Sequence, residues 1–358
     1  MAMPRLVSHA LTLAATLAMA PAFAQDAVAA FYKGRTINLY IASSVGGGYD
    51  TYARLLARHF TKYIPGAPTI LPANMTGAGG NVAAGYIANI AAKDGTAIAL
   101  VLPGTITEPL YAGREKFRHD PATLAYLGSA NSEVNMCYAR ADSGISTAAD
   151  LTQRELIIGA SAEGGSTRDQ PAVQNNLLGH KFRIVSGYPG SREIFLAIEK
   201  NEVSGVCGLG LPAVRQQRAD WLEKGFLRIL TQDNAKGDAT LTAMGVPRTI
   251  DLARSSDDRQ IMELIYSQQN FGRPFIMASE TPTDRLAALR QAFMQALADK
   301  DLLAEAERLK IDISPIAGDE LQAIVAKIYA TPPALIERAR AALIYKPPGW
   351  SGPLLRAP

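Results

Sequence analysis

Short apolar runs alternate along this chain with segments of helical spacing, and glycine-rich turns join them. The apolar run 37–42 is followed by residues 52–60, whose apolar side chains fall on one helical face. The same strand-then-helix order recurs at 69–72 with 82–92, and a further strand is expected at 97–102. Parallel strands need a helical crossover between them, so this order predicts a parallel, doubly wound α/β sheet.

A second series of this kind begins near residue 126, and we expect two doubly wound α/β domains in the 358 residues. The expected strands of this series lie at 125–128, 134–138, 156–160, 182–186, 203–207 and 227–230, and its helices at 167–178 and 191–199. From residue 281 onward the pattern is mostly helical. Pattern alone does not tell where this C-terminal part packs.

The composition excludes several classes of protein. Hydrophobic residues make up 48% and charged residues 19%, which is typical of a globular chain and not of a disordered one. Lys and Arg number 36 and Asp and Glu 33, and because nucleic-acid binding needs a clear basic excess we expect no nucleic-acid partner. Four histidines and two cysteines provide few ligands for a metal centre, and we expect no metal and no cofactor.

Residues 1–24 have the pattern of a secretory signal peptide. Arg5 supplies the basic region, residues 6–20 are mainly apolar, and Ala22-Phe23-Ala24 fits the small-x-small cleavage site. The alternative is a membrane anchor, but the apolar stretch is shorter than the about 20 residues that a spanning helix needs. We therefore expect export, with cleavage before Gln25.

The two cysteines, Cys137 and Cys207, both lie in apolar, strand-like runs. An exported chain allows a disulfide between them, but the sequence gives no distance. We expect two buried free thiols, with a disulfide as the alternative.

Four glycine-rich turns each join the end of an expected strand to the start of a helix, where ligands bind in open α/β sheets. They cover residues 43–50, 75–81, 161–168 and 188–191. Glycine lets backbone N–H groups approach a ligand, and the helix behind them adds positive potential, which suits a carboxylate or a phosphate. A turn without a ligand is the alternative for each. Because two turns lie in each half of the chain, we expect them to face each other across a cleft.

These turns lack the motifs of nucleotide binding and of hydrolysis. Val82 stands where a G-x-G-x-x-G pattern needs its third glycine, and no P-loop sequence occurs. Residues 164–168 miss the G-x-S-x-G pattern of hydrolases at Arg168. Ser166 and Thr167 have hydroxyls that cap a helix or donate to a ligand, and Arg168 has the geometry to pair with a carboxylate. The alternative is a capped helix with a solvated arginine.

At these residues the sequence resembles the Bug-type periplasmic solute receptors of tripartite tricarboxylate transporters, over most of the chain after the signal. The motifs that carry the resemblance are Gly47-Gly48-Tyr49-Asp50 with Ala53-Arg54, Asn74 to Asn81, Asp94-Gly95, Ser161 to Thr167, Tyr188 to Ser191 and Asn201 to Gly205. The N-x-x-G-A-G-G-N stretch at 74–81, in order with the other motifs, is the most specific of them.

The resemblance implies a periplasmic binding protein type II-like fold, in which a hinge joins the two domains. The first domain is expected at 25–126 with a return at 250–358, and the second at 127–249. A small organic acid is expected to bind between them. The implied ligand-binding residues are Ser43, Ser44, Gly46, Gly47, Asp50, Ala78, Gly79, Gly80, Ser166, Thr167, Arg168 and Gly190.

The resemblance also implies a function. A monomeric receptor in the periplasm would close on a carboxylate and deliver it to the membrane permease subunits of a tripartite transporter, and it would not be an enzyme. Two alternatives are a receptor that reports its ligand to a signalling partner and a secreted hydrolase that uses Ser166. The hydrolase needs a base, and His59, His119 and His180 fall on an amphipathic helix or in loop-like stretches.

Overall fold

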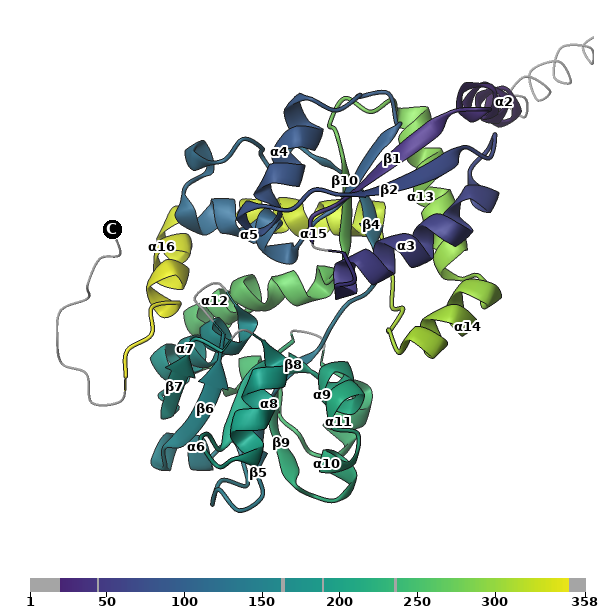
Figure 1. The fold of residues 1–358 in the computed structure, drawn as a ribbon. Coiled ribbons are helices and arrows are strands. Elements are labelled where there is room, and N and C mark those ends of the chain that lie inside the picture. The colour runs from purple at the N-terminus through teal and green to yellow at the C-terminus, as the bar shows by residue number, and fades with distance from the viewer. Residues whose placement is uncertain (1–19, 44, 162–164, 189, 235–236, 348–358) are drawn as a thin grey trace, which may run out of the picture.

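The computed structural model describes residues 20–43, 45–161, 165–188, 190–234 and 237–347, without the side chains of residues 20–25 and 216. The described strands form two sheets, each with helices packed against it. Figure 1 shows two lobes, with helix α12 (Ser256–Tyr266) lying between them. The expected α/β fold with two domains is therefore confirmed.

The first domain is built on a six-stranded sheet of order β11-β4-β10-β3-β1-β2. Its strands are β1 (Thr36–Ile41), β2 (Thr69–Asn74), β3 (Ala97–Leu100), β4 (Ala125–Ser129), β10 (Pro274–Met277) and β11 (Ile316–Ala317). Its helices are α2 (Ala20–Tyr32), α3 (Gly48–Phe60), α4 (Asn81–Asn89), α5 (Pro103–Ala112), α13 (Thr283–Leu297), α14 (Lys300–Leu309), α15 (Gly318–Tyr329) and α16 (Pro333–Ala342), with 3-10 turns η1 (Thr61–Tyr63), η2 (Ala78–Gly80), η3 (Arg114–Lys116) and η5 (Ser267–Phe271). β1 is parallel to β2 and β3, as the strand-then-helix pattern predicts, whereas β10 and β11 run antiparallel to their partners.

The second domain is built on a five-stranded sheet of order β7-β6-β8-β5-β9. Its strands are β5 (Asn135–Arg140), β6 (Leu156–Ala160), β7 (Phe182–Ser186), β8 (Gly205–Gly210) and β9 (Leu227–Gln232). Its helices are α6 (Asp150–Gln153), α7 (Ser166–Leu178), α8 (Ser191–Glu199), α9 (Leu211–Gln217), α10 (Asp220–Glu223) and α11 (Ala239–Ala243), and the 3-10 turn η4 (Thr249–Leu252) leads into α12. β6 is parallel to β7 and β8, and β5 is antiparallel to β8 and β9.

Strand β4 lies in the first sheet, although the sequence analysis grouped it with the second series. It pairs with β10 and β11, which come from the C-terminal part of the chain. No local pattern reveals this pairing, since the partners are far from β4 in the sequence.

The core of the first domain follows from the alternation in β1. Ile37, Leu39 and Ile41 are buried, and they belong to one apolar cluster with residues of α3 such as Leu55 and Phe60. The small buried residues of α4 pack in a second cluster with β3, α12 and α15. Both faces of this sheet are therefore covered, and the carboxyl ends of its parallel strands remain as the accessible edge.

Two segments cross between the domains and are hydrogen-bonded to each other. The outgoing segment 130–135 follows β4, and the returning segment 267–273 precedes β10. The Ala130 N–H donates to the Arg273 carbonyl at 3.1 Å, the Gly272 N–H to the Asn131 carbonyl at 3.0 Å, and the Glu133 N–H to the Gln269 carbonyl at 2.9 Å. The crossings thus form one short two-stranded connection.

The end of the described chain reaches back to the second domain. Asn176 of α7 donates to the carbonyls of Ala342 and Ile344, each at 2.8 Å. The Ile184 N–H of β7 donates to the Tyr345 hydroxyl at 2.9 Å. The C-terminal part therefore contacts both domains, and α16 also packs against α5 and α12.

Cys137 and Cys207 form a disulfide, so the expectation of two free thiols is wrong. Both side chains are fully buried, and they lie on the neighbouring antiparallel strands β5 and β8. The strands bring together two residues that are 70 positions apart, a distance that sequence alone does not give.

We expect the double variant Cys137→Ala with Cys207→Ala to have a free energy of unfolding about 2–4 kcal/mol lower than the wild type. The disulfide closes a long loop and so restricts the unfolded chain, and the variant loses this restriction. Urea unfolding followed by circular dichroism measures this difference. Thiol titration of the urea-unfolded wild-type protein should find no free thiol, and two reactive thiols per chain would contradict the disulfide.

Candidate functional site

A cleft of about 1500 Å³ lies between the two domains. The first domain lines it with the turn after β2, the start of α5 and one face of α4. The second domain lines it with the start of α7. The two crossing segments contribute Glu133, Asn135, Gln269 and Arg273. The cleft therefore lies at the carboxyl edge of the first sheet, where ligands bind in open α/β folds.

The first glycine-rich turn is closed by its own side chain. Asp50 is buried, and its carboxylate accepts hydrogen bonds from the Gly46 N–H, from Arg54 and from Asn74, each at 2.9 Å. Burial raises the pKa of this carboxyl, but the hydrogen bonds from Arg54, Gly46 and Asn74 together outweigh it and hold the pKa below its usual value. The Gly46 amide thus already has an anionic acceptor.

This turn lies apart from the cleft lining. Ser43, Gly46, Gly47 and Asp50 are absent from the cleft surface, and Ser44 lies outside the described residues. The Ser43 carbonyl accepts from Asn74 at 2.8 Å, which ties the turn to the end of β2.

The second turn reaches the cleft. Ala78 and Gly79 line it, whereas Gly80 is buried beneath them. Gly80 has a φ of +97°, and a Cβ there would lie 2.5 Å from the Thr105 hydroxyl oxygen, so only glycine fits. Thr105 also donates to the Gly79 carbonyl at 3.0 Å. The turn is therefore fixed onto the first turn of α5.

The third turn enters the cleft from the second domain at the start of α7. Ser166 and Arg168 line the cleft, while Thr167 is buried and bonded to Ser161. Ser166 donates to the Gly208 carbonyl at 2.8 Å. Gly208 has a φ of +70°, and a Cβ there would lie 2.3 Å from the Ser166 carbonyl oxygen. This close approach holds the N-terminus of α7 against β8.

Arg168 is held at the cleft surface by contacts with the second domain and with the C-terminal segment. It donates to Asp169 at 2.9 Å and to the Leu343 carbonyl at 2.5 Å. Gly190, from the fourth turn, precedes α8 and is absent from the cleft lining. Of the twelve expected residues, the cleft thus brings together Ala78, Gly79, Ser166 and Arg168.

Arg273 is a cleft residue that the sequence analysis missed. Its guanidinium lies over the ring of Tyr49 at 4.2 Å and of Tyr52 at 4.9 Å, and it is 3.4 Å from Glu133. Burial lowers the pKa of this guanidinium, but Tyr49 and Glu133 outweigh burial and raise it, so Arg273 stays charged. A single arginine between Gly272 and Pro274 gives no signal in the sequence.

The described histidines lie away from the cleft lining. His59 is 2.9 Å from Glu305, His119 is bonded to the Thr105 carbonyl, and His180 is bonded to Gln174. Among the described residues, no group of three His, Cys, Asp or Glu side chains is placed to hold a metal ion. In the same part of the chain, no helix has the length and apolar character to cross a membrane.

Comparison with known proteins identifies the fold. No protein-family model matches the sequence, and no curated protein matches it either. A TctC solute binding protein from Polaromonas superposes with a TM-score of 0.66 at 16% identity, covering 87% of this chain and 99% of that one. The R. palustris protein Rpa4515 with adipate superposes with a TM-score of 0.58 at 19% identity, covering 86% of this chain and 97% of that one. MatC from Rhodopseudomonas palustris with bound malate superposes with a TM-score of 0.55 at 18% identity, covering 87% of this chain and 99% of that one. The chain has the fold of these solute-binding proteins.

We expect Asp50→Asn to lower the free energy of unfolding by about 1–3 kcal/mol at pH 7. The substitution replaces a buried carboxylate, which accepts hydrogen bonds from Arg54, Asn74 and the Gly46 N–H, with a weaker, uncharged acceptor. The native pKa of Asp50 lies below its unfolded value of about 3.9, so this stabilisation is present above that pH and is lost as the pH falls through the native pKa. Urea unfolding at pH 7 and pH 3 measures both differences.

Asp301→Asn serves as the control, since the Asp301 side chain is 84% exposed. It should change the free energy by less than about 0.5 kcal/mol. Equal effects of the two substitutions at pH 7 would contradict a structural role for Asp50.

Proposed function

We propose that the chain is a periplasmic solute-binding protein of the tripartite tricarboxylate transporter type, which captures a small organic acid between its two domains. The observation that carries this proposal is the cleft, in which the helix starts of α5 and α7 line opposite walls. The ordered Bug-type motifs and the shared fold support it.

The chemistry of the walls favours an anion. Helix N-termini carry partial positive charge, and α5 and α7 contribute one such terminus from each domain. Arg168 and Arg273 add full charges to the same cleft. Asp169 lies beside Arg168, and Glu133 lies beside Arg273. A bound carboxylate would therefore share each arginine with a carboxylate of the protein.

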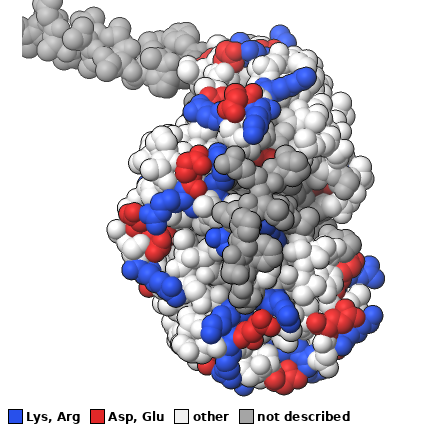
Figure 2. Space-filling model, turned by 90° about the vertical axis from the view of Figure 1, so that its left-hand side faces the viewer, with Lys and Arg blue, Asp and Glu red and all other residues white. Residues whose placement is uncertain are grey.

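Local contacts, not a long-range field, would select the ligand. Figure 2 views the molecule from the side of α5 and α16, and it shows Lys and Arg side chains interspersed with Asp and Glu on that face. A mixed surface of this kind gives little electrostatic steering. An organic acid fits this pattern, and two structures of the same fold were solved with adipate and with malate.

Ligand capture would work through closure of the domains. A ligand shifts the balance between open and closed forms only by its differential affinity for the two. Ser166 and Arg168 come from the second domain, whereas Ala78 and Gly79 come from the first, so a ligand touching both sets favours closure. The paired crossing segments at 130–135 and 267–273 would act as the hinge.

We place the protein in the periplasm, after removal of residues 1–24, as a monomer that hands its ligand to permease subunits. The signal pattern supports export; residues 1–19 lie outside the described part, and residues 20–24 lie at the start of α2. We propose binding and not catalysis, since the Ser166 hydroxyl donates to the Gly208 carbonyl and none of His59, His119 and His180 lines the cleft.

We expect at least one of malate, adipate and citrate to stabilise the purified protein. A ligand at about 100 times its Kd adds about 2.7 kcal/mol to the free energy of unfolding, which a thermal-shift assay detects as a rise of several degrees. No shift with any organic acid, including larger ones, would contradict the proposal.

The variant Arg168→Gln should lower the affinity for the acid that binds by about tenfold or more, because a hydrogen bond from a charged donor is lost. Arg183→Gln is the matched control, since Arg183 is 59% exposed on β7 and away from the cleft. Isothermal titration calorimetry compares the two, and equal affinities would place the anion site elsewhere.

A further inference from the structure

One face of helix α4 presents an apolar stripe to the cleft. Val82 and Tyr86 are four residues apart on one side of the helix, Ile90 follows directly after its last turn, and all three line the cleft. Val82 is 48% exposed and Ile90 71% exposed. Ala83 and Ile87, on a neighbouring side of the helix, are buried in the core, and Tyr86 packs partly against the same core, so Val82 and Ile90 are the stripe residues that the core leaves exposed.

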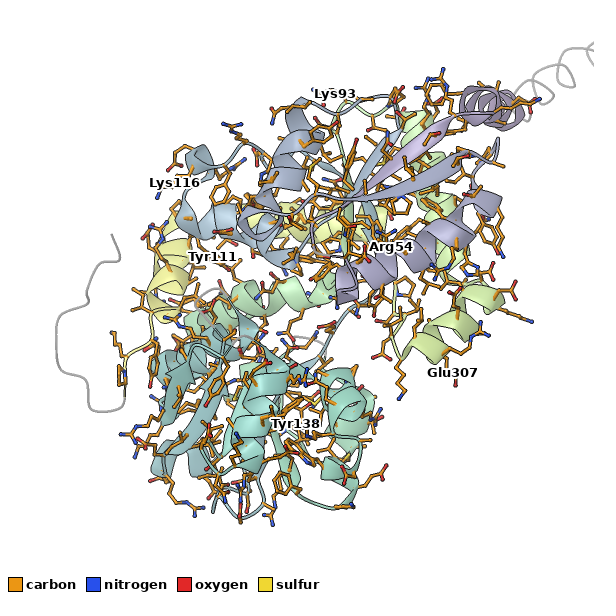
Figure 3. The ribbon with its side chains drawn as sticks, viewed as in Figure 1. Arg54, Lys93, Tyr111, Lys116, Tyr138 and Glu307 are labelled. Atoms are coloured by element: carbon orange, nitrogen blue, oxygen red, sulfur yellow. A yellow bond between two sulfur atoms is a disulfide. The ribbon has the colours of Figure 1, made fainter. Side chains whose placement is uncertain are left out.

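The facing wall is also apolar and aromatic. Tyr111 of α5 and Phe117, which follows η3, line the same cleft, and Figure 3 shows Tyr111 on the α5 side of the molecule, between Lys116 and the second domain. The Tyr86 ring is held by an edge contact with Tyr40, with ring centroids 4.9 Å apart. The wall therefore offers ordered aromatic surface.

Basic side chains border this apolar wall. Lys116 and Arg118 line the cleft beside Phe117, and neither forms an ion pair within the described part of the chain. Arg168 and Arg273 lie at the inter-domain part of the same cleft. Three acids, Glu108, Glu133 and Asp169, line the same cleft, so the four cations exceed them by one. An apolar surface beside this small cationic excess complements a ligand that is apolar in its body and anionic at one end.

A short acid would leave this apolar wall exposed to water. Ligand sites bury most of their ligand against apolar side chains, with a few polar groups that fix its orientation. Malate has no apolar body to cover Val82, Tyr86 and Ile90, and exposed apolar surface of this kind marks a binding site. A ring fills a space between aromatic walls with more buried area than a short chain does.

Resting on the proposed function, we propose that the ligand is an organic acid with an aromatic ring. Its carboxylate binds at the inter-domain end, by Ser166, Arg168 and Arg273, and its ring lies between the α4 stripe and the wall of Tyr111 and Phe117.

Calorimetry on the purified full-length mature protein tests this, with phenylacetate and 3-phenylpropionate as ring acids and malate and adipate as short acids. We expect the better ring acid to bind at least about tenfold more tightly than either short acid, since a buried ring adds tens of square ångströms of apolar contact. Tighter binding of malate or adipate would overturn this inference and leave the proposed function standing.

Variants at the stripe locate the ring. Val82→Gln keeps the charge of the wall and should weaken binding of the ring acid by about threefold to tenfold, while changing short-acid binding by less than about twofold. Ile90 lies about 12 Å further along the helix axis, beyond the reach of the same ring, so Ile90→Gln should change binding of either acid by less than about twofold. Leu303→Gln on α14 is the matched control, because Leu303 is 40% exposed and lies away from the cleft.

Two further outcomes are decisive. Ring acids that bind equally to wild type and to the Val82→Gln variant would overturn the placement of the ring. Absence of heat and of thermal shift with all four acids would overturn this inference, and the same result with citrate and larger organic acids would overturn the proposed function itself.

Discussion

The pairing of the two crossing segments is the constraint on which the rest of this structure depends. Residues 130–133 and 269–273 exchange backbone hydrogen bonds, so the two segments that cross between the sheets form one connection and not two separate loops. Arg273 and Glu133 lie on this connection, and they therefore form part of the cleft between the domains. The C-terminal segment and an apolar cluster of α7, α12 and α16 also join the lobes, so relative motion of the two domains has to preserve or remake these contacts.

The ability of the cleft to bind an anion also depends on which N–H and O–H donors are already hydrogen-bonded within the protein. The amide of Gly46 is bonded to Asp50, and Ser166 is bonded to Gly208, so the protein pairs several donors internally. What remains for an anion is the start of α5 and of α7 with two arginines, each beside a carboxylate. The C-terminal segment adds to this arrangement, because the Leu343 carbonyl accepts from Arg168 and fixes the direction of that side chain.

The sequence predicted the site in part, for reasons that are visible in particular residues. Glycine-rich turns identify strand-to-helix junctions, and two of them, at Ala78–Gly79 and Ser166–Arg168, do line the cleft. The turn at 43–50 has the same pattern, but its own aspartate occupies it. Arg273 and the stripe of Val82, Tyr86 and Ile90 were missed, since an isolated arginine gives no pattern and a helix with two apolar faces does not tell which face is buried.

The sequence by itself determined the α/β class, the two series of strands and the glycine-rich junctions, because these follow from periodicity and backbone freedom over a few neighbouring residues. Only the tertiary structure decided that β4 pairs with β10 and β11, that Cys137 meets Cys207, and that Arg168 meets Leu343. Those contacts join residues far apart in the chain, and they depend on how whole sheets and helices pack, which no local pattern records.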